Sequence, residues 1–155
     1  GNRRAMEQKL LDIIAFQRRE QKYPASLILM DLDNFKRVND KHGHAKGDDI
    51  LVAFVETIDR RIRETDGLFR FGGEEFVSLM PNTSLGGGFK IAEKVRELIE
   101  HLEFEYEGQR IPITISCGIS LFATDDTPED VFERADKALY QAKSQGRNRV
   151  VIAQE

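Results

Sequence analysis

The sequence predicts a fold of the α+β class, and three observations support this prediction. Hydrophobic residues recur at helical spacing in several segments, as expected for helices with one buried face. Other stretches are continuously hydrophobic or alternate between hydrophobic and polar residues, which is typical of strands. Gly72 and Gly73 separate two such stretches, residues 68–71 and 76–80, and this pattern is a strong hairpin signal.

Length and composition indicate one globular domain in a reducing compartment. The 155 residues suffice for a single domain with a sizeable core, and 40% are hydrophobic. The net charge of −4 argues against a nucleic-acid binder, and the sequence shows neither a membrane span nor a secretory signal. The single cysteine, Cys117, has hydrophobic neighbours that favour a buried residue over a nucleophile. We therefore expect a cytoplasmic chain, although upstream segments of a full-length protein would be able to anchor it to a membrane.

The first elements lead to a buried strand with acidic residues at its end. Hydrophobic spacing predicts a helix over residues 4–20, which Pro24 closes. Residues 26–32 form a continuous hydrophobic run, typical of a central strand covered on both faces. The run ends with Asp31 and Asp33, which places carboxylates at the carboxyl end of the strand.

The remaining elements follow in a regular order. Asn34 is expected to cap a short helix that ends at Gly43, and the next helix is expected to begin after Gly47. After the hairpin, a helix starts at residues 82–84. The last predicted elements are strands over 103–106 and 111–121, a helix that opens at 127–130 and stops at 146, and a strand over 150–152.

The hairpin carries the first candidate site. Glu74 and Glu75 follow the glycines in a hydrophobic strand, so they need a partner: a metal ion, a phosphate-bound metal or an arginine. With a two-residue loop, Arg70 would lie opposite Glu75, and the two glutamates would point to opposite faces. We therefore expect Glu75 to pair with Arg70 and Glu74 to meet Asp31. Two carboxylates and a backbone carbonyl suit Mg²⁺ bound with substrate phosphates. A solvated acidic turn is the alternative.

Two further groups of residues have both a functional and a purely structural interpretation. Tyr140, Lys143 and Arg147 fall at helical spacing near the end of the last predicted helix. Their cations would neutralise a triphosphate, or simply complement the helix dipole. Asn39 and Asp48 flank His44 and would hydrogen-bond the edge of a purine, or serve as helix and loop caps.

An ordered set of motifs resembles the GGDEF family, the diguanylate cyclases. Residues 70–76 are similar to the family signature in its Gly-Gly-Glu-Glu-Phe form, with Gly72, Gly73, Glu74, Glu75 and Phe76. The other motifs fall in family order: Asn2-Arg3-Arg4, residues 31–36, Asn39-Asp40, Gly43-His44, Gly47-Asp48, residues 114–119, residues 135–140, Ala142-Lys143 and residues 146–148. The resemblance covers nearly the whole chain.

The resemblance implies a nucleotidyltransferase that condenses two GTP molecules into cyclic di-GMP with release of pyrophosphate. It implies a mainly antiparallel sheet of about five strands surrounded by helices, similar to the palm of adenylyl cyclases and polymerases. The roles that it implies are as follows: Asp31, Glu74 and the carbonyl of Leu32 hold Mg²⁺ or Mn²⁺; Glu74 activates the 3′-hydroxyl; Asn39, Asp48 and nearby His44 contact guanine; Phe35, Lys36, Lys143 and Arg147 approach the triphosphate.

The resemblance also implies regulation and assembly. Arg63 and Asp66 stand where the family places its RxxD product-inhibition site, and the plain alternative is a helix-end arginine before an Asp-Gly turn. Because one protomer would hold one GTP, catalysis requires a homodimer. We expect residues 1–155 to be one catalytic domain cut from a longer protein with an upstream regulatory region.

Two competing functions stay open at this point. The first is a non-catalytic module that binds GTP or cyclic di-GMP and passes a signal to a partner. A degenerate module of this kind would be expected to lose Asp31 or an acid of the hairpin, and this sequence keeps them. The second is a scaffold domain, which would require all the motifs to coincide by chance.

Overall fold

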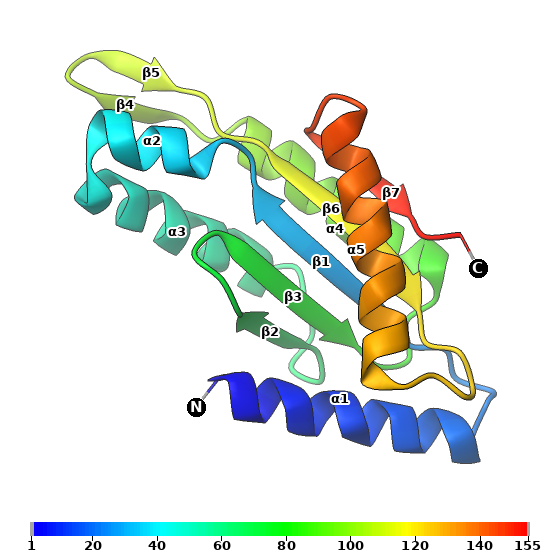
Figure 1. The fold of residues 1–155 in the computed structure, drawn as a ribbon. Coiled ribbons are helices and arrows are strands. Elements are labelled where there is room, and N and C mark those ends of the chain that lie inside the picture. The colour runs from blue at the N-terminus through cyan, green and yellow to red at the C-terminus, as the bar shows by residue number, and fades with distance from the viewer. Residues whose placement is uncertain (1, 155) are drawn as a thin grey trace.

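The computed structural model describes residues 2–154 of the chain, in which helices surround a five-stranded sheet (Figure 1). Gly1 and Glu155, which the predicted domain bounds include, lie outside the described residues. The helices are α1 (Asn2–Arg19), α2 (Phe35–His42), α3 (His44–Asp59), α4 (Leu85–Glu100) and α5 (Pro128–Ser144). The strands are β1 (Ser26–Leu32), β2 (Gly67–Arg70), β3 (Glu75–Met80), β4 (Phe104–Tyr106), β5 (Gln109–Ile111), β6 (Ile115–Leu121) and β7 (Arg149–Ile152).

Strand β1 lies at the centre of the main sheet. The strand order is β2-β3-β1-β6-β7, and every pair is antiparallel except β6 and β7, which are parallel. All residues of β1 are buried, as its continuous hydrophobic run predicts. The prediction of a mainly antiparallel sheet of about five strands surrounded by helices is therefore confirmed.

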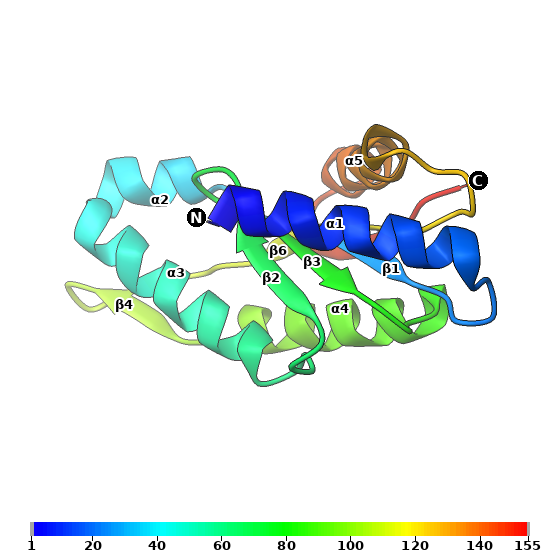
Figure 2. The same ribbon diagram turned by 90° about the horizontal axis from the view of Figure 1, so that it is seen from below.

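Helices cover both faces of this sheet and give it two cores. Helices α3 and α4 lie on one face, whereas α5 lies on the other face with α1 beside it (Figure 2). Successive side chains of a strand point to opposite faces. Accordingly, Ile28 and Met30 of β1 join the core under α3 and α4, and Leu27 and Leu29 join the core under α1 and α5.

The helix starts follow the predicted caps in two cases and differ in one. Thr127 and Asp130 form a reciprocal capping box at α5, with Pro128 as its first residue. The Ser84 hydroxyl accepts from the backbone N–H of Gly87 at 3.0 Å and caps α4. Asn34 precedes α2 but its side chain makes no capping bond, because its backbone is left-handed with φ of 58°. Asparagine adopts this conformation more readily than most residues, so Asn34 turns the chain and does not cap the helix.

Two predicted boundaries are wrong. The expected strand over residues 111–121 is interrupted, because Pro112 has no N–H to donate and separates β5 from β6. Strands β4 and β5 consequently form a separate two-stranded sheet. Helix α3 begins at His44, before Gly47, because Gly43 adopts a φ of 88° and links α2 directly to α3.

None of the helices between residues 2 and 154 has the combination of length and hydrophobicity that crossing a bilayer requires.

The contact between β6 and α5 provides a test of the fold. A Cβ atom at Gly118 would overlap the carbonyl oxygen of Ala135 and lie 3.0 Å from the Cα of Leu139. We expect Gly118→Ala to destabilise the protein by about 1–3 kcal/mol, since α5 must move away from the sheet. The measurement is the midpoint of thermal or urea unfolding. The matched control is Gly73→Ala, where a Cβ meets no atom within 4 Å, and equal midpoints for the two variants would contradict this packing.

Candidate active site

Several predicted site residues lie where the end of β1 meets the β2–β3 hairpin and the last turn of α5 (Figure 1). In the β1–β3 register, Asp31 lies directly opposite Glu75. The backbone N–H of Leu32 donates to the carbonyl of Glu74 at 3.2 Å. On the other side, the ammonium group of Lys143 in α5 donates to the carboxylate of Asp31.

Asp31 is a buried carboxylate in a negatively charged environment. Asp31 is only 5% exposed to solvent. Burial raises the pKa of the Asp31 carboxyl above 3.8; the hydrogen bond and charge of Lys143 oppose this shift, and the charges of Glu74 and Glu75 add to it. Three carboxylates therefore act on one another here, and Lys143 offsets only part of their charge.

The register of the hairpin differs from the predicted one. Arg70 pairs with Phe76, and Phe71 donates its N–H to the carbonyl of Glu75 at 3.1 Å. The loop therefore holds the three residues 72–74 and is one residue longer than expected, which shifts every cross-strand pair.

The predicted pairing of Arg70 with Glu75 is consequently wrong. The Arg70 guanidinium instead donates to the loop carbonyls of Gly72 and Gly73, with a shortest distance of 2.7 Å to Gly73. These carbonyls lie beyond the last ladder pair of the hairpin, and the guanidinium supplies donors to them. Glu75 is left on the same side of the sheet as Asp31.

The glycines and the phenylalanine of the hairpin have different structural roles. A Cβ atom at Gly72 would lie 3.0 Å from a carboxylate oxygen of Glu75, whereas a Cβ at Gly73 would enter open space. Neither glycine has a left-handed φ. The two positions therefore differ in the space available for a side chain, and not in the backbone conformation that they require. Phe76 is buried and packs its ring 4.8 Å from that of Phe54 in α3, which fixes the hairpin to the core.

The predicted guanine-binding residues lie where α2 meets α3. Gly47 packs so closely against Asn39 that a Cβ would overlap the Asn39 side-chain oxygen. That oxygen is buried and has no hydrogen-bond partner. His44 and Asp48 are exposed at the start of α3. The structure therefore brings the Asn39 amide close to the helix that carries Asp48.

Phe35 and Lys36 form the first turn of α2, directly after β1. Phe35 is buried and anchors this turn in the core, while Lys36 is exposed. The first turn of a helix leaves backbone N–H groups without helical partners, and these can donate to an anion. This arrangement fits the predicted approach of the main chain to phosphate.

Arg147 does not continue the helix as its spacing predicts. Helix α5 ends at Ser144, and Arg147 lies in the following turn with a left-handed φ of 65°. Its N–H donates to the carbonyl of Ala142 at 2.9 Å. Lys143 is in the last turn of the helix, and Tyr140 is 72% exposed on its outer surface.

The comparison with known proteins decides the family. The family described as diguanylate cyclase, GGDEF domain, matches residues 1–149. The chain belongs to the GGDEF family. Diguanylate cyclase DgcP of Pseudomonas aeruginosa is 41% identical over 152 residues, which cover 98% of this chain and 22% of that protein. The chain therefore spans about a fifth of the length of this relative.

Solved structures of GGDEF domains share the fold. The GGDEF domain of DgcB from Caulobacter crescentus, in complex with c-di-GMP, superposes with a TM-score of 0.93 at 29% identity, covering 100% of this chain and 92% of that one. The active GGEEF domain of a diguanylate cyclase from Vibrio cholerae superposes with a TM-score of 0.85 at 32% identity, covering 96% of both chains. The predicted family and fold are thus confirmed.

The oxygen ligands of this GGDEF domain fit a hard divalent cation of the kind typical of the family. Within residues 2–154, no three His, Cys, Asp or Glu side chains form a ready-made metal cluster. Mg²⁺ commonly takes only one or two protein carboxylates and completes its shell with water and substrate phosphates. Asp31, Glu74 and the Leu32 carbonyl, the set that the family resemblance implies, would supply donors of this kind, and the negative charge around Asp31 favours a cation.

The structure places Arg63 and Asp66 in contact with each other. The Asp66 side chain is fully buried, and its carboxylate accepts from the backbone N–H of Arg63 at 2.8 Å and from the Arg63 guanidinium at 3.3 Å. The guanidinium also donates to the Pro81 carbonyl and the Thr83 hydroxyl, both at 2.6 Å. Asp66 is therefore part of the turn, and half of the Arg63 side chain is exposed.

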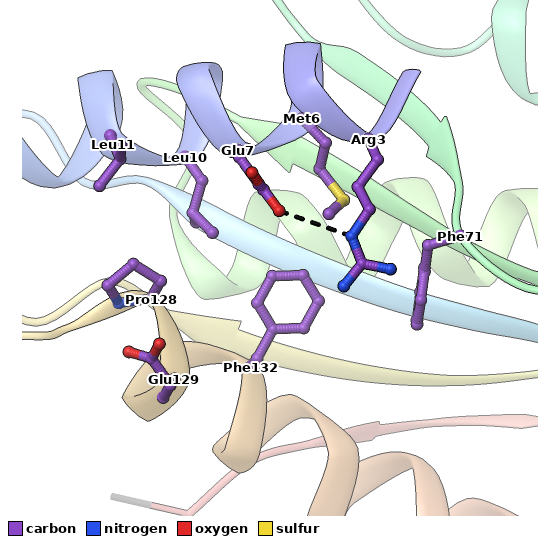
Figure 3. A pocket seen from close by; sticks show the side chains of 9 residues that line it. All are labelled: Arg3, Met6, Glu7, Leu10, Leu11, Phe71, Pro128, Glu129 and Phe132. Carbon is purple, nitrogen blue, oxygen red and sulfur yellow. Dashed lines mark ion pairs between the residues drawn. The ribbon is translucent and has the colours of Figure 1, made fainter. Parts of the chain in front are cut away.

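Two further features lie outside the catalytic region. Figure 3 shows a groove of about 460 Å³ between α1 and α5, into which Phe132 points and which Phe71 borders. Its mainly hydrophobic lining does not suit a triphosphate. Cys117 is fully buried and burial raises the pKa of its thiol, which agrees with the prediction of a structural residue.

Asp33 has a structural role that the sequence pattern did not indicate. Its buried carboxylate accepts from the hydroxyls of Thr114 and Ser116, each at 2.7 Å, and from the backbone N–H of Asn148 at 3.1 Å. Asp33 lies in the turn directly after β1, two residues beyond Asp31. That spacing was visible in the sequence, but the three donors come from distant segments.

Asp31 and Asp33 should respond in opposite ways to neutralisation. The raised pKa means that folded Asp31 binds its proton more tightly than the unfolded chain does, so its contribution to stability declines as the pH rises from below 3.8 through the raised pKa. We expect Asp31→Asn to be at least as stable as the wild type at pH 7.5, with the difference shrinking toward pH 4.

The matched control is Asp33→Asn, which weakens three hydrogen bonds and should cost about 1–3 kcal/mol at pH 7.5. Urea unfolding of both variants at the two pH values measures the effects. A large loss of stability in Asp31→Asn at pH 7.5 would contradict this description of the site.

Proposed function

We propose that this chain is the catalytic domain of a diguanylate cyclase, which condenses two GTP molecules into cyclic di-GMP and releases pyrophosphate. The observation that carries the proposal is the cluster at the carboxyl end of β1, where Lys143 donates to the Asp31 carboxylate, Glu75 lies opposite Asp31, and the backbone of Glu74 is bonded to Leu32. Carboxylates for a metal and a cation for phosphates are thereby close together. Membership of the GGDEF family supports the same reaction.

Each group of residues has a defined task in this proposal. Asp31, Glu74 and the Leu32 carbonyl would hold Mg²⁺ or Mn²⁺, which supplies charge stabilisation at the α-phosphate when bound. Glu74, at the hairpin tip, would accept the proton of the attacking 3′-hydroxyl. Lys143 and Arg147 would bind the triphosphate, together with the first turn of α2.

The guanine base would be read by Asn39 and Asp48. The buried Asn39 oxygen without a partner is an unsatisfied acceptor in this structure, and a guanine edge offers donors to such a group. The exposed Asp48 carboxylate would accept from the exocyclic amino group. His44 is the first residue of α3 and lies four residues before Asp48 in the sequence.

Catalysis would take place between two copies of the domain. One set of these residues can hold one GTP, and the reaction joins two, so the two sites must face each other in a homodimer with pseudo-two-fold symmetry. We propose that residues 1–155 act as a single catalytic unit within a longer cytoplasmic or membrane-anchored protein. Non-catalytic binding of GTP or cyclic di-GMP is the alternative, and retention of Asp31 and Glu74 favours catalysis.

Removal of the Glu74 charge tests the reaction. Glu74→Gln keeps the shape of the side chain but loses the metal ligand charge and the proton acceptor. We expect cyclic di-GMP formation from GTP and Mg²⁺ to fall at least about a thousandfold, while the unfolding midpoint stays unchanged. The assay uses a dimerised protein across a range of enzyme concentrations. Full turnover in this variant would overturn the assignment of Glu74, and a wild type that binds GTP without turnover would favour the non-catalytic alternative.

Product inhibition at Arg63 and Asp66 forms a separate test. The Arg63 side chain is half exposed, and its guanidinium would bind guanine or phosphate of cyclic di-GMP. We expect Arg63→Ala to raise the inhibition constant for added cyclic di-GMP at least about tenfold with little change in the initial rate. Thr83→Val is the control, because it removes one contact of Arg63 and keeps the guanidinium. Unchanged inhibition in Arg63→Ala would rule out this site.

A further inference from the structure

The turn after α5 has a backbone that needs external support. Arg147 and Asn148 are consecutive non-glycine residues with left-handed φ angles of 65° and 49°. L-amino acids disfavour this conformation, and such residues persist only where surrounding contacts hold them. The contacts of this turn therefore determine the position of the Arg147 backbone and the direction in which its side chain leaves it.

Asn148 provides those contacts on three sides. Its backbone N–H donates to the Asp33 carboxylate at 3.1 Å. Its side-chain oxygen accepts from the Arg96 guanidinium at 2.9 Å, and its amide nitrogen donates to the Glu100 carboxylate. One residue thus joins the turn to the end of β1 and to two positions of α4.

The partners of Asn148 are themselves fixed. The Arg96 side chain is only 15% exposed, and its guanidinium also donates to Glu93 with a shortest distance of 2.5 Å. Asp33 is held by the hydroxyls of Thr114 and Ser116 at the start of β6. The turn is consequently fastened to groups that have little freedom to move.

The chemistry of the contact explains why an amide stands at this position. Arg96 and Glu100 lie 3.6 Å apart as an ion pair. Because the guanidinium can only donate and the carboxylate can only accept, a residue that bonds both must accept on one atom and donate on the other. Asparagine does both and also tolerates a left-handed backbone. An aspartate would fit the space but would set its second oxygen against Glu100.

We propose that Asn148, held by Arg96, Glu100 and Asp33, is a positioning residue that orients Arg147 toward the terminal phosphates of GTP. The inference rests on the proposed function, because Arg147 is assigned there to the triphosphate. Asn148 acts through its neighbour and does not itself touch the nucleotide. Loss of the clamp should therefore weaken binding of GTP and leave binding of GMP, which lacks the terminal phosphates, unchanged.

The experiment measures equilibrium binding of GTP and of GMP with Mg²⁺ on the full chain, on a time scale short enough to exclude turnover. We expect Asn148→Asp to weaken GTP binding about tenfold and GMP binding less than twofold. The double variant Asn148→Asp with Glu100→Gln restores a donor opposite the new carboxylate and keeps the wild-type net charge. It should recover GTP affinity to within about threefold of the wild type.

Two further variants keep the test decisive. Arg96→Lys preserves the charge but loses the forked guanidinium that bonds both Glu93 and Asn148. It should show the same selective weakening of GTP binding, and it replaces Asn148→Asp in the test if that variant does not fold. In an Arg147→Ala background, Asn148→Asp should have no additional effect. Equal losses for GTP and GMP, no recovery in the double variant, or an additive effect with Arg147→Ala would overturn the proposal. A wild type that binds GTP but makes no cyclic di-GMP would refute the proposed function alone, because these readouts do not depend on turnover.

Discussion

Strand β1 is hydrogen bonded along both edges and covered on both faces, and the candidate site follows from this constraint. At its amino end the buried Ser26 hydroxyl donates to the Thr83 carbonyl, whereas the two buried carboxylates, Asp31 and Asp33, stand at and just after its carboxyl end. Asp33 receives three hydrogen bonds and ties β6 and the turn after α5 to β1. Asp31 receives a single cation and faces two further carboxylates. The end of β1 therefore carries two acids with different roles: Asp33 holds the structure together, and Asp31 is left available for chemistry.

The sequence predicted the elements of the fold well, because hydrophobic periodicity and caps are local properties. The buried run of β1, the hairpin and the capping box of α5 are examples. The hairpin register was not predictable in this way, because one extra loop residue leaves the pattern of hydrophobic residues unchanged. Because of this shift in register, Arg70 donates to loop carbonyls and does not pair with Glu75. Arg147 likewise kept a helical spacing in the sequence although the helix ends three residues earlier.

The structure joins Asp31, the hairpin and Lys143, whereas Asn39 and Asp48 lie apart at the junction of α2 and α3; the roles of all these residues come from the family and stay predictions. Spacing alone did not indicate that Asn39 would leave a buried oxygen without a partner against Gly47. Nor did it indicate that Asp66 would be fully buried in its own turn. Both features depend on contacts between segments that a single sequence does not relate. They show that the site is formed by tertiary packing around a few short motifs.

The ion pair between Lys143 and Asp31 has a consequence for the order of binding events. Before any ligand arrives, the Lys143 ammonium is already paired with the Asp31 carboxylate, and this ion pair is partly shielded from bulk salt. In the proposed function, a phosphate that bound Lys143 would release Asp31 for a cation, and a cation that bound Asp31 would release Lys143 for a phosphate. By thermodynamic linkage each event favours the other. The domain would then discriminate against free nucleotide and free cation and respond chiefly to the complex of the two.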